Sequence, residues 1–342
     1  MIYFAAFTAR GAALAAQLAS SVGTAAKAFA FEKYAQAAGC LPIHGLQSWC
    51  GQAWSEADSL VFVGAAGIAV RGIAPYVKSK LTDPGVVVMD EAGRYIISLL
   101  SGHIGGGNDL ALRLAVLTGG TPVVTTATDV NRLFAVDVFA KDNDLYITSM
   151  KQAKELSAAL LRGECIGLKT KLPIAGILPR GLMPEPQRLN LEIGFTAEDP
   201  ESLLLIPRTV CLGIGCKRDT PEEQIRSRVE EFLALHDLPR AAIESLASIT
   251  LKADEPGLLE YAAHEHLPIR FFTAETLNEA PGTFSASGFV AKKTGVDCVC
   301  ERAAVCGSEM GTLFGKKYAA DGVTVAAAAR TIELSFRKEY CE

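Results

Sequence analysis

A single histidine stands among glycines in the segment Ser-Gly-His-Ile-Gly-Gly-Gly-Asn, residues 101–108. An imidazole has an ordinary pKa of about 6.5, so His103 is suited to act as a general base or acid at neutral pH. Glycines let a ligand approach the backbone closely, and Asn108 belongs to the residue types that cap helices. Because the first amides of a helix attract negative charge, we expect those from Gly105 to Asn108 to bind an oxyanion.

The segment therefore predicts acid–base chemistry beside an anion-binding turn, although a histidine bonded within a structural turn would have the same pattern. The substrate-binding residues expected in this segment are Ser101, Gly102, Gly105, Gly106 and Asn108.

A second glycine-rich segment, residues 64–76, follows the apolar run Ser-Leu-Val-Phe-Val. The run is typical of a buried parallel strand, so we expect Gly64 and Gly67 to lie at the same sheet edge as His103. Arg71 comes in or near the next helical turn and could form a bidentate pair with a substrate carboxylate. An exposed arginine beside packing glycines is an equally good interpretation.

Two adjacent acids, Asp90 and Glu91, follow the next apolar run. With Gly93 they are typical of a hairpin turn, which is the favoured interpretation. One of them could still orient His103 or activate water, so both are kept as candidate catalytic residues.

A fourth turn carries Gly213, Gly215 and Arg218 in the sequence Gly-Ile-Gly-Cys-Lys-Arg. It comes between an expected strand and an expected helix and could bind an anion. It is not a complete G-x-G-x-x-G, because Arg218 stands at the third glycine position, so dinucleotide binding has little support.

The elements that must position these residues alternate between strand and helix, which predicts an α/β fold. We expect two mostly parallel-sheet α/β units, residues 1–134 and 209–342, joined by a small middle module, residues 135–208. Strands are expected over residues 94–100 and 121–129, and strand pieces within residues 134–147. A helix is expected over residues 108–120, ending at two glycines.

Composition excludes several classes of protein. The 342 residues are 49% apolar and 21% charged with a net charge of −5, so no basic surface for nucleic acid is expected. No run of 18 apolar residues predicts a membrane span. Nine cysteines without an export signal predict a reducing, cytoplasmic location. Cys298, Cys300 and Cys306 do not have a standard zinc spacing, so no protein-bound metal is expected.

The glycine-rich segments resemble the CbiG family, the cobalt-precorrin-5A hydrolases of anaerobic cobalamin biosynthesis. The resemblance covers nearly the whole chain and is strongest over residues 61–80, 83–115 and 120–129, continuing over 212–225 and 321–330. Gly107 departs from the family pattern, in which alanine is expected.

The resemblance implies a substrate and a reaction. The substrate would be a cobalt-bearing tetrapyrrole with a δ-lactone on ring A, which water opens with release of acetaldehyde. Cobalt would belong to the substrate, no separate cofactor is implied, and other enzymes of the cobalamin pathway are the partners it suggests. His103 is then the candidate base, with Asp90 or Glu91 in reserve.

Two other functions are consistent with parts of the pattern. A non-catalytic tetrapyrrole carrier would use the same carboxylate-binding turns without a base. A nucleotide-dependent oxidoreductase would share the α/β fold, but the incomplete glycine pattern argues against it.

Overall fold

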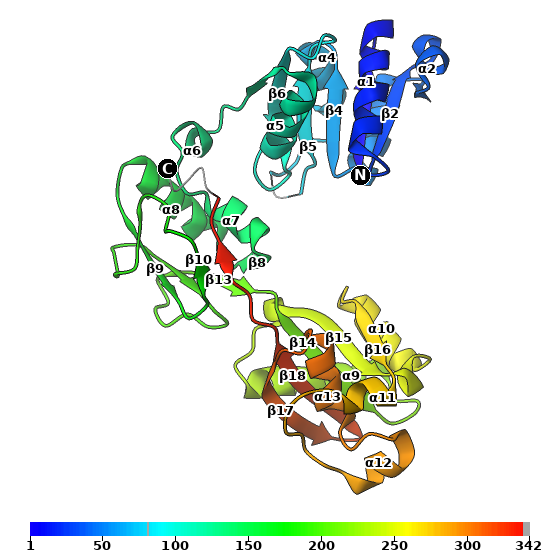
Figure 1. Cartoon of the computed structure of the whole chain (residues 1–342), viewed down its shortest axis with the longest axis vertical. Helices are drawn as coiled ribbons and strands as arrows, with labels where there is room; N and C mark the ends of the chain where they lie inside the picture. The colour runs from blue at the N-terminus through cyan, green and yellow to red at the C-terminus, as the bar shows by residue number, and fades with distance from the viewer. Residues whose placement is uncertain (81, 338–342) are drawn as a thin grey trace. The chain divides into compact units, whose positions relative to one another are not determined.

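The computed structural model describes residues 1–80 and 82–337, and Figure 1 shows how its elements follow one another. The chain divides into two compact units, Met1–Val138 and Phe139–Glu342. The expected boundaries after residues 134 and 208 stay predictions. Within the described residues, no helix is long and apolar enough to cross a membrane.

The first unit is built on one seven-stranded sheet. Its strands, in spatial order, are β3 (Leu41–Ile43), β2 (Ala26–Phe31), β1 (Ile2–Ala6), β4 (Ser59–Val63), β5 (Gly85–Met89), β6 (Tyr95–Leu100) and β7 (Thr121–Val123). The first five run parallel, in the order of a doubly wound sheet. The last two run parallel to each other but antiparallel to β5.

Helices cover both faces of this sheet. Successive side chains of a strand point to opposite faces, so each apolar strand places side chains that need covering on both sides. Phe4, Val61 and Met89 pack with the helices α1 (Ala9–Val22), α2 (Glu32–Ala38) and α5 (Gly107–Thr118). Tyr3 and Phe62 pack on the other face with α3 (Leu46–Glu56) and α4 (Ala66–Ile73). In Figure 1, α1 and α5 accordingly lie on one side of the strands. The prediction of a mostly parallel α/β sheet is confirmed.

The direction of β6 overturns one expectation about the site. A tight turn at Asp90 reverses the chain, so that Leu100, at the end of β6, pairs with Val86, at the start of β5. The loop that carries His103 therefore lies at the edge where the parallel strands begin. Gly64 follows the end of β4, at the opposite edge, and a five-residue strand spans about 13 Å. The prediction that His103 and Gly64 share one edge is wrong, because the hairpin turn at Asp90 reverses the chain before the loop that carries His103.

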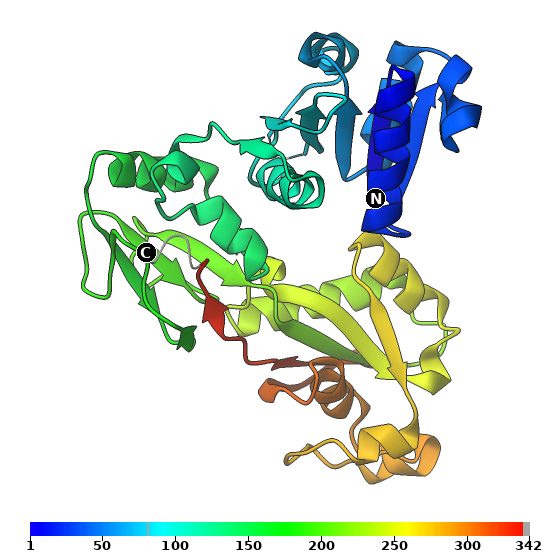
Figure 2. The same ribbon diagram turned by 45° about the horizontal axis from the view of Figure 1, so that its top comes forward.

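The second unit begins with a small mixed sheet. Its order is β11 (Leu182–Met183), β9 (Ile166–Thr170), β12 (Asn190–Ile193), β13 (Leu203–Pro207) and β8 (Leu145–Ile147), with β8 antiparallel and α8 (Met150–Leu161) beside it. Strand β19 (Leu334–Ser335) returns to pair with β10 (Ile174–Ala175), as the red strand in Figure 2 shows. Residues 134–147 give β8 as expected, but Val136–Asp142 forms the helix α7 instead of a strand.

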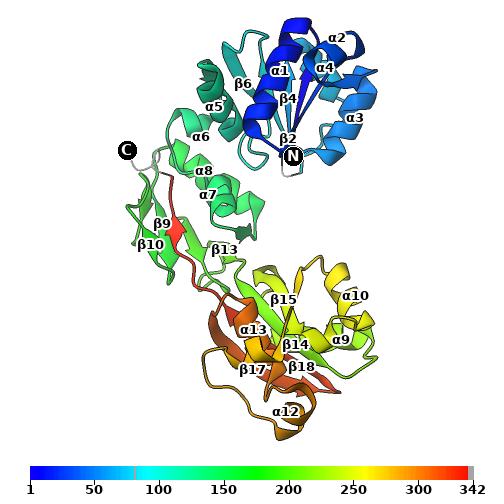
Figure 3. The ribbon, with the colours of Figure 1, turned by 45° about the vertical axis from the view of Figure 1, so that its right-hand side comes forward.

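A second α/β sheet completes this unit. Its order is β16 (Ile269–Phe272), β15 (Ile243–Ile249), β14 (Val210–Cys216), β18 (Val323–Ala329) and β17 (Thr312–Ala320), the first three parallel. Helices α9 (Glu222–Leu235) and α10 (Pro256–His264) cover one face, while α13 (Val299–Gly307) and α11 (Ala274–Asn278) cover the other (Figure 3). A short helix, α12 (Gly288–Thr294), precedes α13.

Candidate active site

The loop after β6 folds back on itself before α5 begins. Ser101 has a left-handed backbone with φ of 51°, and Gly106, with φ of 76°, occupies the cap position of α5. The amide of Gly107 donates to the Ser101 carbonyl at 3.1 Å, and that of Asn108 donates to the Gly102 carbonyl at 2.9 Å. A left-handed non-glycine residue costs about 1–3 kcal/mol and is a common feature of functional loops.

These bonds correct two expectations about the loop. The amide of Gly106 is also occupied, by the carbonyl of His103 at 2.9 Å. Three amides expected to bind an oxyanion thus already donate to main-chain oxygens, and for these the prediction is wrong. Asn108 is not the helix cap either, because it lies inside the first turn of α5 with its side chain buried.

The glycines of the loop allow the chain to pack against itself. A Cβ on Gly102 would overlap the side-chain amide of Asn108, and one on Gly105 would overlap Ser101 and the Gly85 amide. A Cβ on Gly85, at the start of β5, would likewise overlap the Gly105 carbonyl. The close approach predicted for a ligand is therefore made by neighbouring protein groups at these positions.

The imidazole of His103 lies between two carboxylates. Its Nε2 is 2.7 Å from Oδ2 of Asp129, and its Nδ1 is 3.1 Å from Oδ1 and 3.3 Å from Oδ2 of Asp137. The hydroxyl of Thr128 is 3.5 Å from Nε2. The His103 side chain is 14% exposed, so both ion pairs are partly shielded from water.

Asp129 comes from the short helix α6 (Ala127–Val130), which follows β7. The side-chain amide of Asn108 donates to Oδ2 of Asp129 at 3.0 Å and to the hydroxyl of Thr126 at 3.2 Å. Oδ2 of Asp129 is thus held from two directions, by His103 and by Asn108. Asn108 therefore acts as a link between α5 and the carboxylate.

Asp137 comes from the first turn of α7 and holds the other side of the ring. Its Oδ1 accepts the Val138 amide at 3.0 Å, and its Oδ2 lies 3.9 Å from the ammonium of Lys80. The loop that carries Lys80 is itself fixed, because the buried carboxylate of Asp83 accepts the amides of residues 78 and 79 at 2.8 and 2.9 Å.

The two carboxylates determine the charge of the imidazole. Burial alone would lower the pKa of His103, but the hydrogen bonds to Asp129 and Asp137 outweigh it and raise the pKa to about 9. Burial likewise opposes ionisation of Asp137, yet His103 and Lys80 hold its pKa below the ordinary value. At neutral pH the ring is therefore an imidazolium, with both nitrogens donating, and it has no free lone pair to accept a proton.

The other predicted catalytic residues do not join this group. Asp90 accepts the amides of Ala92, Arg94 and Tyr95 at 2.8, 3.0 and 2.9 Å, so it builds the hairpin turn that was the favoured interpretation. Glu91 accepts the hydroxyl of Thr8 at 2.7 Å. Both follow the end of β5 and therefore lie at the edge opposite His103.

Gly64, Gly67 and Arg71 lie at that same opposite edge. The Gly64 amide donates to the Met89 carbonyl at 2.8 Å, which joins the ends of β4 and β5. Gly67 and Arg71 are exposed, and the guanidinium of Arg71 contacts only the carbonyl of Gly67, at 3.4 Å, among the polar groups described. Arg71 is thus available to an anionic ligand, and its role stays a prediction.

The turn in the second unit is held by internal contacts. A Cβ on Gly213 would overlap the Cys300 carbonyl of α13, and one on Gly215 would lie 2.6 Å from the Thr324 hydroxyl. Arg218 is paired with Asp254 at 2.6 Å. The structure explains both glycines by packing, and the binding roles of all three residues stay predictions.

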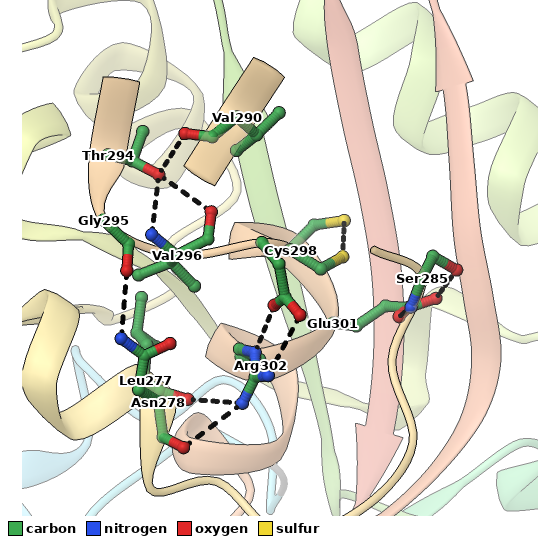
Figure 4. Close-up of polar contacts among 12 residues, drawn as sticks. Leu277, Asn278, Ser285, Val290, Thr294, Gly295, Val296, Cys298, Glu301 and Arg302 are labelled. Carbon is green, nitrogen blue, oxygen red and sulfur yellow. Dashed lines mark hydrogen bonds and ion pairs between the residues drawn. The ribbon is translucent and has the colours of Figure 1, made fainter. Parts of the chain in front are cut away.

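Cys298 and Cys300 lie beside a set of polar contacts at the start of α13 (Figure 4). The sulfur atoms of Cys298 and Cys300 are 3.9 Å apart. The buried carboxylate of Glu301 accepts the amide and hydroxyl of Ser285 at 2.6 and 2.9 Å, and Arg302 pairs with Asp297 at 2.7 Å. Across residues 1–80 and 82–337, no group of three or more histidine, cysteine or acidic side chains could hold a metal ion.

Sequence reasoning missed Asp129, Asp137 and Lys80. Asp129 was expected at the end of a strand over residues 121–129, but β7 stops at Val123. Asp137 was placed among strand pieces and lies instead in the first turn of α7. The sequence contained one indication for Asp129, because it is the last residue of the segment 120–129, on which the family resemblance rests.

A doubly wound unit with a partly buried imidazolium between two carboxylates defines an α/β protein with an acid–base site. Two family models match the chain, "Cobalamin synthesis G N-terminal" over residues 48–129 and "Cobalamin synthesis G C-terminus" over residues 210–328. Together they match more than half of the chain. The chain belongs to the CbiG family of cobalamin synthesis proteins, as its glycine-rich segments predicted.

Two curated relatives and one solved structure are similar to the chain. It is 37% identical over 335 residues to the cobalt-precorrin-5A hydrolase of Salmonella typhimurium, covering 93% of this chain and 94% of the relative. It is 32% identical to the cobalt-precorrin-5A hydrolase of Priestia megaterium, covering 79% and 78%. A cobalamin biosynthesis protein G homolog from Sulfolobus solfataricus aligns over 96% of both chains, with 23% identity and a TM-score of 0.43.

Proposed function

We propose that this chain is a cobalt-precorrin-5A hydrolase. It opens the ring-A δ-lactone of cobalt-precorrin-5A with water, releases acetaldehyde and yields cobalt-precorrin-5B. The observation that carries the proposal is the 37% identity to the Salmonella enzyme over 93% of the chain. The site supports it, because His103 and Asp129 both lie inside the segment matched by the N-terminal family model.

The chemistry requires proton transfer in two steps, the opening of the lactone and the breaking of the C–C bond. Water must lose a proton as its oxygen bonds to the lactone carbonyl carbon, and the ring oxygen must gain one as it leaves. The freed hydroxyl then loses its proton as the C–C bond breaks, and the bonding electrons pass into the conjugated macrocycle. A carboxylate next to a fixed cation can serve both steps, since it accepts and returns a proton without moving.

The substrate carries several acetate and propionate arms, so binding needs cationic and amide donors. We assign one of these contacts to the exposed guanidinium of Arg71. Gly102, Gly105, Gly106 and Asn108 are not part of this assignment, because they pack against the protein or donate to it. The substrate contacts of Ser101, Gly213, Gly215 and Arg218 stay predictions. Cobalt enters as part of the substrate, and a cytoplasmic location belongs to the same proposal.

The test is incubation of the purified full chain with cobalt-precorrin-5A. We expect acetaldehyde, trapped as a hydrazone, in a one-to-one ratio with the loss of substrate, and a product mass that corresponds to the addition of water and the loss of acetaldehyde. Recovery of unchanged substrate without acetaldehyde would favour the tetrapyrrole-carrier alternative and overturn the proposal.

A further inference from the structure

We infer that Asp129 is the general base for lactone opening, and that His103 is the positioning residue that holds it. The inference rests on the proposed function and refines it, because His103 itself was the expected base. It follows from three features of the site, namely the distribution of contacts over the two carboxylates, their exposure, and the occupation of both imidazole nitrogens.

The two oxygens of Asp129 have different surroundings. Oδ2 accepts His103 Nε2 at 2.7 Å and Asn108 Nδ2 at 3.0 Å. Among the residues that the structure describes, none donates to Oδ1. The Asp129 side chain is 22% exposed, against 14% for Asp137. One oxygen is thus anchored while the other is open to water or to a substrate group.

Asp137 lacks this asymmetry. Both of its oxygens lie within 3.3 Å of His103 Nδ1, Oδ1 also accepts the Val138 amide, and Oδ2 faces Lys80 at 3.9 Å. Its lone pairs are directed at protein groups, so it serves to orient and charge the imidazole.

His103 cannot be the base while both of its nitrogens donate. The charged groups that face it are Asp129 from α6, Asp137 from α7 and Lys80, which reaches it through Asp137. Burial opposes protonation of the ring, but the two carboxylates outweigh it and favour the protonated form, in which no lone pair is available. The imidazolium instead holds Oδ2 of Asp129 in place through the 2.7 Å contact.

The proton transfers balance on Asp129 alone. Its Oδ1 takes a proton from water as the water oxygen bonds to the lactone carbonyl carbon. When the bond to the ring oxygen breaks, that oxygen leaves with the electron pair and takes the proton back from Asp129. The regenerated carboxylate then removes the proton of the new hydroxyl as acetaldehyde leaves, and the macrocycle carbon that receives the electron pair accepts that proton.

The decisive experiment compares Asp129→Asn with Asp137→Asn, using Asp58→Asn as the matched control. Asp58 lies in the same unit, and its side chain is 85% exposed. We expect Asp129→Asn to lower single-turnover acetaldehyde formation by about 10²–10⁴-fold, with substrate affinity changed by only a few fold. Added formate should restore part of the activity of Asp129→Ala, which a purely structural role would not allow.

The outcomes separate the two proposals. An inactive wild-type protein overturns the proposed function, whereas an active wild type with a near-normal Asp129→Asn overturns only the assignment of the base. If the Asp129 variants do not fold, the kcat/KM of the wild type against pH decides. A rate that rises with pH through the pKa of His103, up to about 9, would restore His103 as the base, and a profile that is level to about pH 8 and then falls supports Asp129.

Discussion

His103 Nε2 and Asp129 Oδ2 are 2.7 Å apart, although the two residues are 26 positions apart in the chain. The contact joins the loop after β6 to the helix after β7, two neighbouring parallel strands whose ends meet at one edge of the sheet. Asp137 completes the arrangement from the other side of the ring. Two carboxylates, one imidazolium and the ammonium of Lys80 therefore form a nearly charge-balanced group.

The first prediction concerns the activity of the wild type against pH. Because the pKa of His103 is raised to about 9, the imidazolium persists through neutral pH. We expect kcat/KM to be level from about pH 6 to 8 and to fall as the pH rises through about 9, when Asp129 loses its fixed cation. Steady-state rates over pH 5–10 measure this, and a level rate up to pH 10 would contradict it.

A second prediction concerns Asp137→Asn. The substitution removes a negative charge that favours the protonated ring, so the pKa of His103 should fall and the alkaline limb of kcat/KM should move to lower pH. At pH 6 the loss of kcat should stay small, because Asp129 is intact. In the control variant Asp58→Asn, the fall of kcat/KM at alkaline pH should stay at the same pH as in the wild type. An unchanged limb in Asp137→Asn would mean that Asp137 does not set the charge of His103.

The sequence identified His103 but neither Asp129 nor Asp137, and the reason is physical. His103 is flanked by glycines and a helix start, which are local signals. Asp129 ends a run rich in β-branched residues, and Asp137 stands in Phe-Ala-Val-Asp-Val-Phe, which alternates like a strand. Tertiary packing overrides both local preferences and forms α6 and α7. The approach of their side chains to His103 exists only in three dimensions.

The edge of the sheet at which His103 lies was equally hard to predict. The run ending at Met89 and the run starting at Tyr95 are separated by only a few residues, and the favoured interpretation of Asp90 was already a hairpin turn. A hairpin reverses the chain, so it places His103 and Gly64 at opposite edges. The two expectations were in conflict, and the turn chemistry of Asp90 was the better guide.

The third prediction concerns stability against pH. The pKa of His103 is higher in the folded protein than the ordinary value, so the contribution of its protonation is fully present below about pH 6.5 and is lost as the pH rises through about 9. The shift corresponds to as much as about 3 kcal/mol. Urea unfolding from pH 6 to 10 should show this decline in the wild type and a flatter profile in His103→Gln. Parallel profiles would show that His103 is not the group responsible.

The fourth prediction concerns Gly102→Ala. The added methyl group would overlap the Asn108 side-chain amide, which must move and release Asp129 Oδ2. We expect a loss of about 1–3 kcal/mol in unfolding free energy and a larger loss of kcat than of substrate affinity. Gly288→Ala is the matched control, since nothing lies within 4 Å of its added Cβ. Wild-type kcat in Gly102→Ala would show that the Asn108 contact is dispensable.

The fifth prediction concerns Asp90 and Glu91, which follow β5 at the edge opposite His103. Asp90→Ala removes the acceptor of three amides and should cost about 1–3 kcal/mol in unfolding free energy, because the hairpin turn loses its internal bonds. Glu91→Gln keeps an oxygen that can accept the Thr8 hydroxyl and should be nearly neutral. Neither change reaches Asp129, so single-turnover acetaldehyde formation by the folded variants should stay within a few fold of wild type. A loss of 10²-fold or more in Glu91→Gln, with unfolding free energy unchanged, would move the chemistry to the opposite edge, where Arg71 also lies.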